Sequence, residues 1–244
     1  MEQTNQDTHT AVEEAPATTN KAALSSSNKV HKAIIVGCGL SGLGMAIWLT
    51  QAGYDDFIIL EKANDLGGTW RENTYPGAAC DIPSTLYSYS FDRNNLEWKE
   101  AYTKQADLLE YQRYLATSYG ILDKIVYGQH VASAMFDEAT TTWKIGTRAN
   151  EEGISCFTCQ HFISAVGQLH HPKIPDAFVD KFKNSFHSAQ WDHSISLEGK
   201  RVAVVGTGAS AIQIIPEVAK IASHVEVYQR TPPYVLPKIL GSYY

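Results

Sequence analysis

The sequence predicts an α/β fold that contains two Rossmann-like βαβ units. The first observation is the stretch KAIIVGCGLSGLGMAIWL at residues 32–49, where an apolar run, a glycine-rich turn and a helical pattern follow one another. The second is that the same pattern recurs at residues 201–222, roughly 165 residues further on. The third is that another apolar run, ending in FIILE or VEVYQ, follows each helical pattern. This order of elements is typical of a dinucleotide-binding unit.

The composition is that of an ordinary globular protein with a sizeable core. The chain has 244 residues, 44% hydrophobic and 19% charged, with a formal net charge of −6. The acidic balance and the lack of a basic run disfavour a nucleic-acid partner, and no apolar run is long enough to span a membrane. The N-terminus lacks the features of a secretory signal. Four cysteines do not make a disulfide framework, so we expect a reducing, cytoplasmic compartment.

The remaining elements follow from periodicity and turn residues. Residues 1–30 are polar and without apolar periodicity, which predicts a disordered tail, and residues 63–98 are irregular. Thr103 is the expected cap of a helix. The expected elements are strands at 33–36, 57–60, 131–136, 142–147, 161–166, 201–205 and 225–228, and helices at 40–51, 103–119 and 210–222.

The first glycine turn has the GxGxxG spacing of a dinucleotide fingerprint. Gly37 allows a tight exit from the strand, Gly39 allows the backbone to approach a pyrophosphate, and Gly42 allows close packing of helix on sheet. Glu61 ends the second strand 19 residues after Gly42, where a carboxylate accepts hydrogen bonds from a ribose diol. The alternative is that Glu61 is a solvated charge at a strand end.

The second turn, GTGASA at 206–211, has the related GxGxxA spacing. Aligning the two second strands places Gln229 opposite Glu61 and Arg230 opposite Lys62. A guanidinium binds a 2′-phosphate bidentately, whereas a carboxylate repels it, so this turn is predicted to take NADP(H). The first turn is predicted to take a non-phosphorylated ribose, as in FAD or NAD. Two such turns indicate electron transfer from NADPH to a second cofactor, for which we expect a flavin. The alternative is that Arg230 is a surface charge.

Further motifs make the reading more specific. They are GGTW at 67–70, YPG at 75–77, CDIPS at 80–84 and YSYSF at 87–91. Together with both glycine turns, they resemble the class B flavin monooxygenases, and especially the Baeyer–Villiger monooxygenases. The resemblance runs from about residue 32 to residue 237.

The resemblance implies roles for particular residues. Besides the first turn and Glu61, it implies FAD contacts at Thr69, Trp70, Arg71, Glu72, Asp81, Ile82 and Tyr87. It implies NADP contacts at Ala79, Cys80, Asp81, Thr207, Gly208, Ala209, Ser210, Ala211, Ile212, Gln213, Arg230 and Thr231.

The resemblance also implies an activity: NADPH reduces FAD, O₂ adds to flavin C4a, and the resulting peroxide inserts one oxygen atom into an organic substrate such as a ketone. Asp81 would have a catalytic role by orienting an arginine beside the flavin. Family members continue well beyond residue 237, and that arginine belongs to the later part. The sequence is therefore expected to be truncated, and both Rossmann-like domains can be incomplete.

The family fingerprint F-x-G-x-x-x-H-x-x-x-W is altered at 182–191. His187 and Trp191 are kept, but Asn184 replaces the glycine and the Phe-to-His spacing is one residue short. This leaves open whether the segment couples the two cofactor sites or only packs. The expected organisation is a tail at 1–30, an FAD-binding domain at 31–170, a linker at 171–198 and the start of an NADP-binding domain at 199–244.

Two alternative functions stay open at the level of sequence. The chain can be a non-catalytic dinucleotide-binding or interaction protein completed by a partner chain. More weakly, Cys156 and Cys159 form a CxxC pair that a flavin disulfide reductase would use, although residues three apart in a strand point to opposite faces. No metal site is expected.

Overall fold

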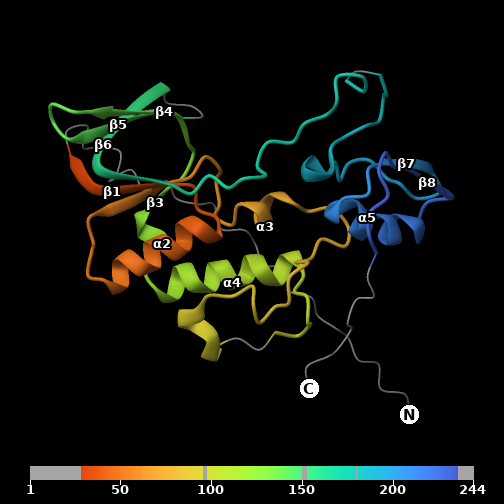
Figure 1. The fold of residues 1–244 in the computed structure, drawn as a ribbon, viewed down its shortest axis with the longest axis horizontal. Coiled ribbons are helices and arrows are strands. Elements are labelled where there is room, and N and C mark those ends of the chain that lie inside the picture. Colours follow the sequence, from red (N-terminus) through yellow and green to blue (C-terminus); the bar gives the residue numbers. More distant parts are fainter. Residues whose placement is uncertain (1–28, 96–97, 150–152, 180, 236–244) are drawn as a thin grey trace, which may run out of the picture.

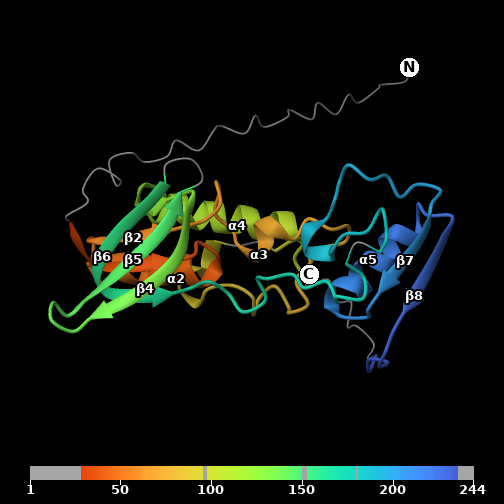
Figure 2. The same ribbon diagram turned by 90° about the horizontal axis from the view of Figure 1, so that it is seen from above.

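The structure is a computed structural model that describes residues 29–95, 98–149, 153–179 and 181–235. Figure 1 shows a larger lobe built on a six-stranded sheet and a smaller lobe built on two strands and one helix. Most of the tail expected at 1–30 lies outside the described residues, but the first strand already begins at Val30. The two lobes lie side by side, with α3 between them (Figure 2).

The larger lobe combines a parallel and an antiparallel part in one sheet, ordered β3-β2-β1-β6-β5-β4. Neighbours from β3 to β6 run parallel, and β6, β5 and β4 form an antiparallel meander. The strands are β1 (Val30–Val36), β2 (Phe57–Leu60), β3 (Ile125–Val126), β4 (Gln129–Asp137), β5 (Thr142–Ala149) and β6 (Gly153–Ser164).

Two helices cover one face of the parallel part, α2 (Leu40–Gln51) and α4 (Gln105–Ser118). Strand residues such as Ile35 pack there against Leu43 and Leu115, all fully buried. Side chains alternate along a strand, so Ile34 points to the opposite face. There it packs with residues of the meander, which folds over that face. Burial on both faces explains why residues 33–36 of β1 and the whole of β2 are unbroken apolar runs.

β6 belongs to both parts of the sheet. Its first half pairs with β5, as in Cys156 opposite Gly146, and its second half pairs with β1, as in Ile163 opposite Ile35. The expected strand at 161–166 is thus only the end of a longer one. The residues before it lack a clean alternation because their surroundings change along the strand.

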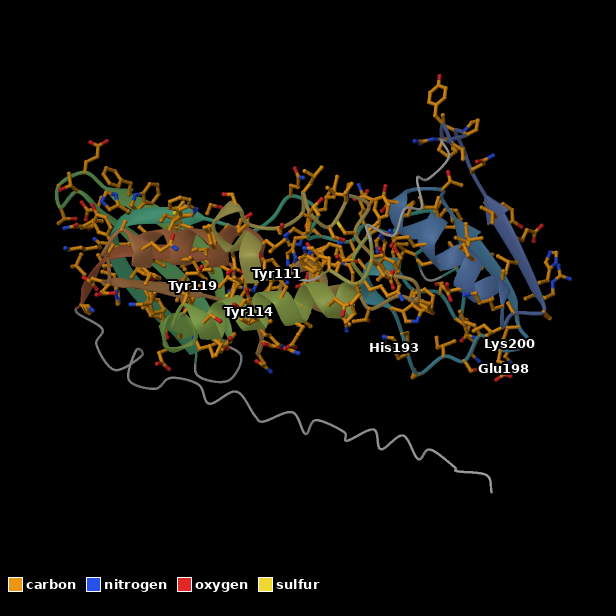
Figure 3. All side chains as sticks on the ribbon, turned by 90° about the horizontal axis from the view of Figure 1, so that it is seen from below. Tyr111, Tyr114, Tyr119, His193, Glu198 and Lys200 are labelled. Atoms are coloured by element: carbon orange, nitrogen blue, oxygen red, sulfur yellow. The ribbon has the colours of Figure 1, made fainter. Side chains whose placement is uncertain are left out.

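The YSYSF segment at 87–91 connects the irregular region at 63–98 to the helices α2 and α4 through hydrogen bonds of Tyr89. The Tyr89 hydroxyl donates a hydrogen bond to the carbonyl of Leu40, and the Tyr89 N–H donates to the hydroxyl of Tyr111 at 3.1 Å. Figure 3 shows Tyr111 on α4 beneath the sheet. A Cβ on Gly44 would lie 2.7 Å from the Tyr89 ring, so this contact requires a glycine in α2. Burial raises the pKa of Tyr111 to about 12.

The start of α4 differs from the expectation. The N-cap is Lys104, not Thr103, and it caps with no side-chain hydrogen bond. The Thr103 hydroxyl instead donates to Ser84 Oγ at 2.5 Å, and both residues are buried. A long-range partner has replaced the local cap.

The smaller lobe is a single βαβ unit made of β7 (Arg201–Val205), α5 (Ala209–Ala219) and β8 (His224–Tyr228). The two strands pair in parallel, and α5 packs on them through Ile214 and Val218. Short elements complete the described chain: α3 (Thr69–Glu72) and 3-10 turns at Ser90–Asn95, Leu122–Lys124 and Ser188–Gln190. Within the described residues, no helix is both long and apolar enough to cross a membrane.

Candidate functional site: two dinucleotide-binding turns

The first glycine turn leaves β1 with the backbone conformation that the fingerprint requires. Gly37 has φ +99°, and its N–H donates to the carbonyl of Leu60 at 2.8 Å. A Cβ on Gly42 would lie 1.9 Å from the carbonyl oxygen of Gly37, so only glycine fits there. α2 begins at Leu40 with Gly39 as its N-cap and no side-chain hydrogen bond. The first backbone N–H groups of α2 are thus available to an anion.

Glu61 is a buried carboxylate beside this turn, and the solvated-charge alternative is wrong. Its side chain follows β2 and the residue is 6% exposed. Oε2 accepts from the N–H of Cys38 at 2.8 Å and Oε1 accepts from the N–H of Ala63 at 2.9 Å. A carboxylate has about four acceptor positions, so two remain for a ribose diol. The turn and the carboxylate that would hold the ribose are therefore locked together.

A second glycine pair packs against the first turn. The N–H of Gly67 donates to the carbonyl of Cys38 at 2.9 Å. Gly68 has φ +52°, and a Cβ on it would lie 3.0 Å from the Cα of Gly39. Two stretches of bare backbone thus face each other at the N-terminus of α2, where any side chain would fill the space. This cradle, with buried Glu61 at its edge, fits a dinucleotide diphosphate and its ribose.

The residues that follow this pair extend the wall of the site. Trp70 lies in a small cluster with Cys80 and Leu108, and its Nε1–H donates to the Tyr87 hydroxyl at 3.2 Å. Thr69, Asp81 and Ile82 are exposed. The structure therefore brings Trp70 and Tyr87, for which the resemblance implies FAD contacts, together with Cys80, for which it implies an NADP contact.

Glu72 carries an ion-pair group that sequence reasoning did not anticipate. Its Oε1 lies 3.1 Å from Arg71 Nη2 and 3.6 Å from Lys62 Nζ. Its Oε2 lies 2.9 Å from His170 Nδ1, and Lys62 also contacts His170 Nε2. Arg71 Nε is buried and has no hydrogen-bond partner among the described residues. α3 is thereby tied to the end of β2 and to His170, directly before the linker, with one donor of Arg71 left for a ligand.

The second glycine turn repeats the backbone of the first. Gly206 has φ +108°, and its N–H donates to the carbonyl of Tyr228 at 2.8 Å, matching the bond from Gly37 to Leu60. Gly208 is the N-cap of α5, again without a side-chain hydrogen bond. A Cβ on Gly206 or Gly208 would meet nothing within 4 Å, so this turn is open.

The shared hydrogen bond fixes the correspondence between the two units. Leu60 and Tyr228 are the last residues of β2 and β8, so Gln229 stands where Glu61 stands and Arg230 where Lys62 stands. Gln229, Arg230 and Thr231 are all exposed. The side chain that follows the second strand is therefore a buried anion in one unit and an exposed amide beside a cation in the other.

Gln213 makes a contact that the sequence did not indicate. It sits in α5, but its side-chain amide bonds to the backbone of Ala79 in the larger lobe. Thr74 Oγ1 and His193 Nε2, 2.8 Å apart, add a contact between the larger lobe and the connector that precedes the smaller lobe. Figure 3 shows His193 in the connector before β7. The sequence alone gave no signal for either contact.

His187 and Trp191, the two kept residues of the H-x-x-x-W segment, contact residues close to them in the sequence. His187 Nδ1 accepts a hydrogen bond from the N–H of Ala189 at 3.1 Å and so caps the short 3-10 turn. Trp191 packs edge-on against Phe186, with ring centroids 5.0 Å apart.

The CxxC pair has the geometry of two separate strand residues. Cys156 is exposed, whereas Cys159 is buried between His31 of β1 and Trp143 of β5. Burial raises the pKa of the Cys159 thiol to about 11, which disfavours the thiolate that disulfide exchange needs.

Comparison with known proteins agrees with this architecture. The family described as pyridine nucleotide-disulphide oxidoreductase matches residues 34–236, and the chain belongs to that family. Within it, the chain is 42% identical over 209 residues to a Baeyer-Villiger monooxygenase of Pseudomonas aeruginosa, covering 85% of this chain and 39% of that protein. It is 39% identical over 216 residues to one of Streptomyces coelicolor, covering 86% and 40%.

Solved structures give the same result. Cyclohexanone monooxygenase from Rhodococcus bound to NADP⁺ matches with a TM-score of 0.78 and 33% identity, over 86% of this chain and 40% of that one. OTEMO in complex with FAD and NADP matches with a TM-score of 0.74 and 34% identity, over 83% and 39%. The resemblance to Baeyer–Villiger monooxygenases and the α/β class are confirmed. The chain spans about 40% of the length of these relatives.

Proposed function

We propose that this chain supplies the two dinucleotide sites of an FAD- and NADPH-dependent monooxygenase of the Baeyer–Villiger type. The observation that carries the proposal is the contrast between two matching turns, one with buried Glu61 and the other with exposed Gln229 and Arg230. The likeness to proteins named as bound to FAD and NADP supports the same assignment.

FAD, when bound, supplies the redox chemistry that links NADPH to O₂ and a small organic substrate such as a ketone. The residues of this chain bind and orient. Glu61 accepts hydrogen bonds from the ribose hydroxyls of FAD, the bare backbone at Gly39 and Gly68 receives its diphosphate, and α2 directs its N-terminus at the same group. Trp70 and Tyr87 line the wall, and Asp81 orients an arginine that the resemblance places after residue 237.

The second turn binds NADPH. Residues 207–212 surround its pyrophosphate at the N-terminus of α5, and Arg230 with Thr231 holds the 2′-phosphate. Ala79, Cys80 and Asp81 lie toward its nicotinamide end. The domain boundaries at 31–170, 171–198 and 199–244, like the cytoplasmic location, remain predictions.

The proposal is tested by titrating the purified chain with FAD, NADPH and NADH, and by following ketone-dependent NADPH oxidation with ¹⁸O₂. We expect FAD to bind, NADPH to bind more tightly than NADH, and one ¹⁸O atom to enter an ester or lactone. A folded chain that binds neither dinucleotide contradicts the proposal. Binding without oxygen transfer would favour the non-catalytic alternative, which the comparisons do not favour; nor do they support a partner chain.

A further inference from the structure

The two lobes contact each other where the YPG loop meets α5. Gly77 has φ +80°, and a Cβ on it would lie 2.7 Å from the backbone oxygen of Gln213 and 3.0 Å from Glu217 Cγ. The loop therefore approaches the helix as closely as a bare backbone allows. This closeness brings the side chain of Gln213 alongside the residues that follow the loop.

The Gln213 side-chain amide makes the same pair of backbone hydrogen bonds that a neighbouring β-strand would make. Its Oε1 accepts from the N–H of Ala79 at 3.1 Å, and its Nε2 donates to the carbonyl of the same residue at 3.0 Å. The hydroxyl of Tyr75 donates to Oε1 at 3.2 Å and holds the amide in this orientation. This fork of two bonds holds the N–H and the carbonyl of Ala79, and so fixes the two peptide groups on either side of its Cα.

The other side of the same segment is also paired. Ala79 forms an antiparallel bridge with Lys104, and the N–H of Cys80 donates to the carbonyl of Thr103 at 2.9 Å. Residues 78–80 thus lie between the start of α4, in the larger lobe, and one side chain of α5, in the smaller lobe. Asp81 follows directly, so its place depends on both neighbours.

We propose that Gln213 is a positioning residue that couples the second glycine turn to the Ala79–Asp81 segment, rather than a ligand of the NADP pyrophosphate. The helix that carries Gln213 starts at the turn, with Gly208 as its N-cap, and Gln213 lies about 7.5 Å from Gly208 along the helix axis. A dinucleotide that settles on the turn orders this helix, and the fork transmits that order to the segment beside the flavin. To bind pyrophosphate instead, the amide would have to give up three hydrogen bonds.

The coupling rests on the proposed function, whereas the fork itself does not. The test therefore has two arms, both on the full chain with the variants Gln213→Met and Gln213→Glu. The first arm measures amide hydrogen exchange at Ala79 and Cys80 by NMR, with and without NADP⁺. The second arm records the change in the FAD absorption spectrum when NADP⁺ is added.

In Gln213→Met we expect the amide hydrogen of Ala79 to exchange about tenfold faster, since its hydrogen bond to residue 213 is lost. The amide hydrogen of Cys80 should still exchange slowly. Gln213→Glu keeps an acceptor and loses the donor, so its effect should be intermediate and show that the bond, not the volume, matters. In the original chain NADP⁺ should slow Ala79 further and shift the FAD spectrum. Both responses should be lost in Gln213→Met, with FAD affinity unchanged. Gln51→Met, at the exposed end of α2, is the matched control.

The exchange rates test the fork, and the FAD spectrum tests the coupling. Unchanged Ala79 exchange in folded Gln213→Met overturns the fork, and an NADP⁺-induced spectral shift that persists in that variant overturns the coupling. If the original chain binds neither FAD nor NADP⁺, the proposed function and the coupling both fail, yet the exchange arm in the cofactor-free chain still tests the fork. Should Gln213→Met not fold, Gln213→Leu, which also lacks the acceptor for the Ala79 N–H, carries the same comparison.

Discussion

Gly42 offers a sharp test of how the first turn is built. A Cβ there would lie 1.9 Å from the carbonyl oxygen of Gly37, and contacts below 3.0 Å are essentially never seen. In Gly42→Ala the start of α2 must therefore move by more than about 1 Å from β1. The Cβ would overlap a backbone oxygen, so no neighbouring side chain can rotate away to relieve the overlap.

The size of the effect follows from the cost of overpacking, about 2 kcal/mol. For a chain of this length that corresponds to a Tm lowered by about 4–8 °C. The displaced helix also moves its N-terminal N–H groups away from the diphosphate, so FAD should bind at least about tenfold more weakly, a loss of about 1.4 kcal/mol. Thermal unfolding and a flavin fluorescence titration measure the two quantities.

Gly208→Ala is the matched control, because a Cβ at Gly208 meets nothing within 4 Å and its φ is −73°. It should keep the Tm within about 2 °C, since only the N-cap preference is lost, and leave FAD binding unchanged. Of the three measured properties, only the affinity for NADP⁺ should fall in Gly208→Ala. If Gly42→Ala and Gly208→Ala have the same Tm and the same FAD affinity, the argument from close packing is refuted.

Three further outcomes are expected. Glu61→Gln places an amide donor against a backbone N–H and should weaken FAD binding about 10- to 100-fold by titration, the range for a hydrogen bond to a charged group; an unchanged Kd would exclude a ribose contact. Arg230→Ala should weaken NADPH about 10- to 100-fold without affecting NADH, whereas the exposed Arg201→Ala should change neither. Cys156 should be alkylated by iodoacetamide at pH 8.5 at least about 100-fold faster than Cys159, because burial raises the pKa of the Cys159 thiol to about 11. The folded form holds that proton more tightly, so the contribution of Cys159 to stability is full at pH 7 and falls as the pH rises from about 9 to about 11; equal labelling of both thiols in folded protein would contradict this.

The local parts of the site could be read from the sequence because each depends on neighbours along the chain. Gly37, Gly42 and Glu61 belong to one βαβ unit, and their spacing determines their geometry. Thr103 shows where such reasoning fails, since its hydroxyl bonds to Ser84 in another segment instead of capping α4.

The contacts between distant segments could not be predicted in this way. Gln213 and Ala79 are 134 residues apart, and His170 and Lys62 are 108 apart. No periodicity or spacing links such pairs, because they meet only once the lobes and the linker are in place. The sequence identified the chemistry of each residue, whereas its partner depends on tertiary structure.

The shared strand β6 also determines where the larger lobe can accept change. β6 leads from the meander to Ala165, whose carbonyl oxygen would lie 2.6 Å from a Cβ on Gly37. A residue inserted after Cys159 would displace Ala165 along the strand by about 3.3 Å and turn every following side chain of the strand to the opposite face. Residues inserted in the exposed turn at 138–141 would alter neither. The hairpin tip is thus a natural place to attach a label or a fused domain, while the strand beside it must keep its length.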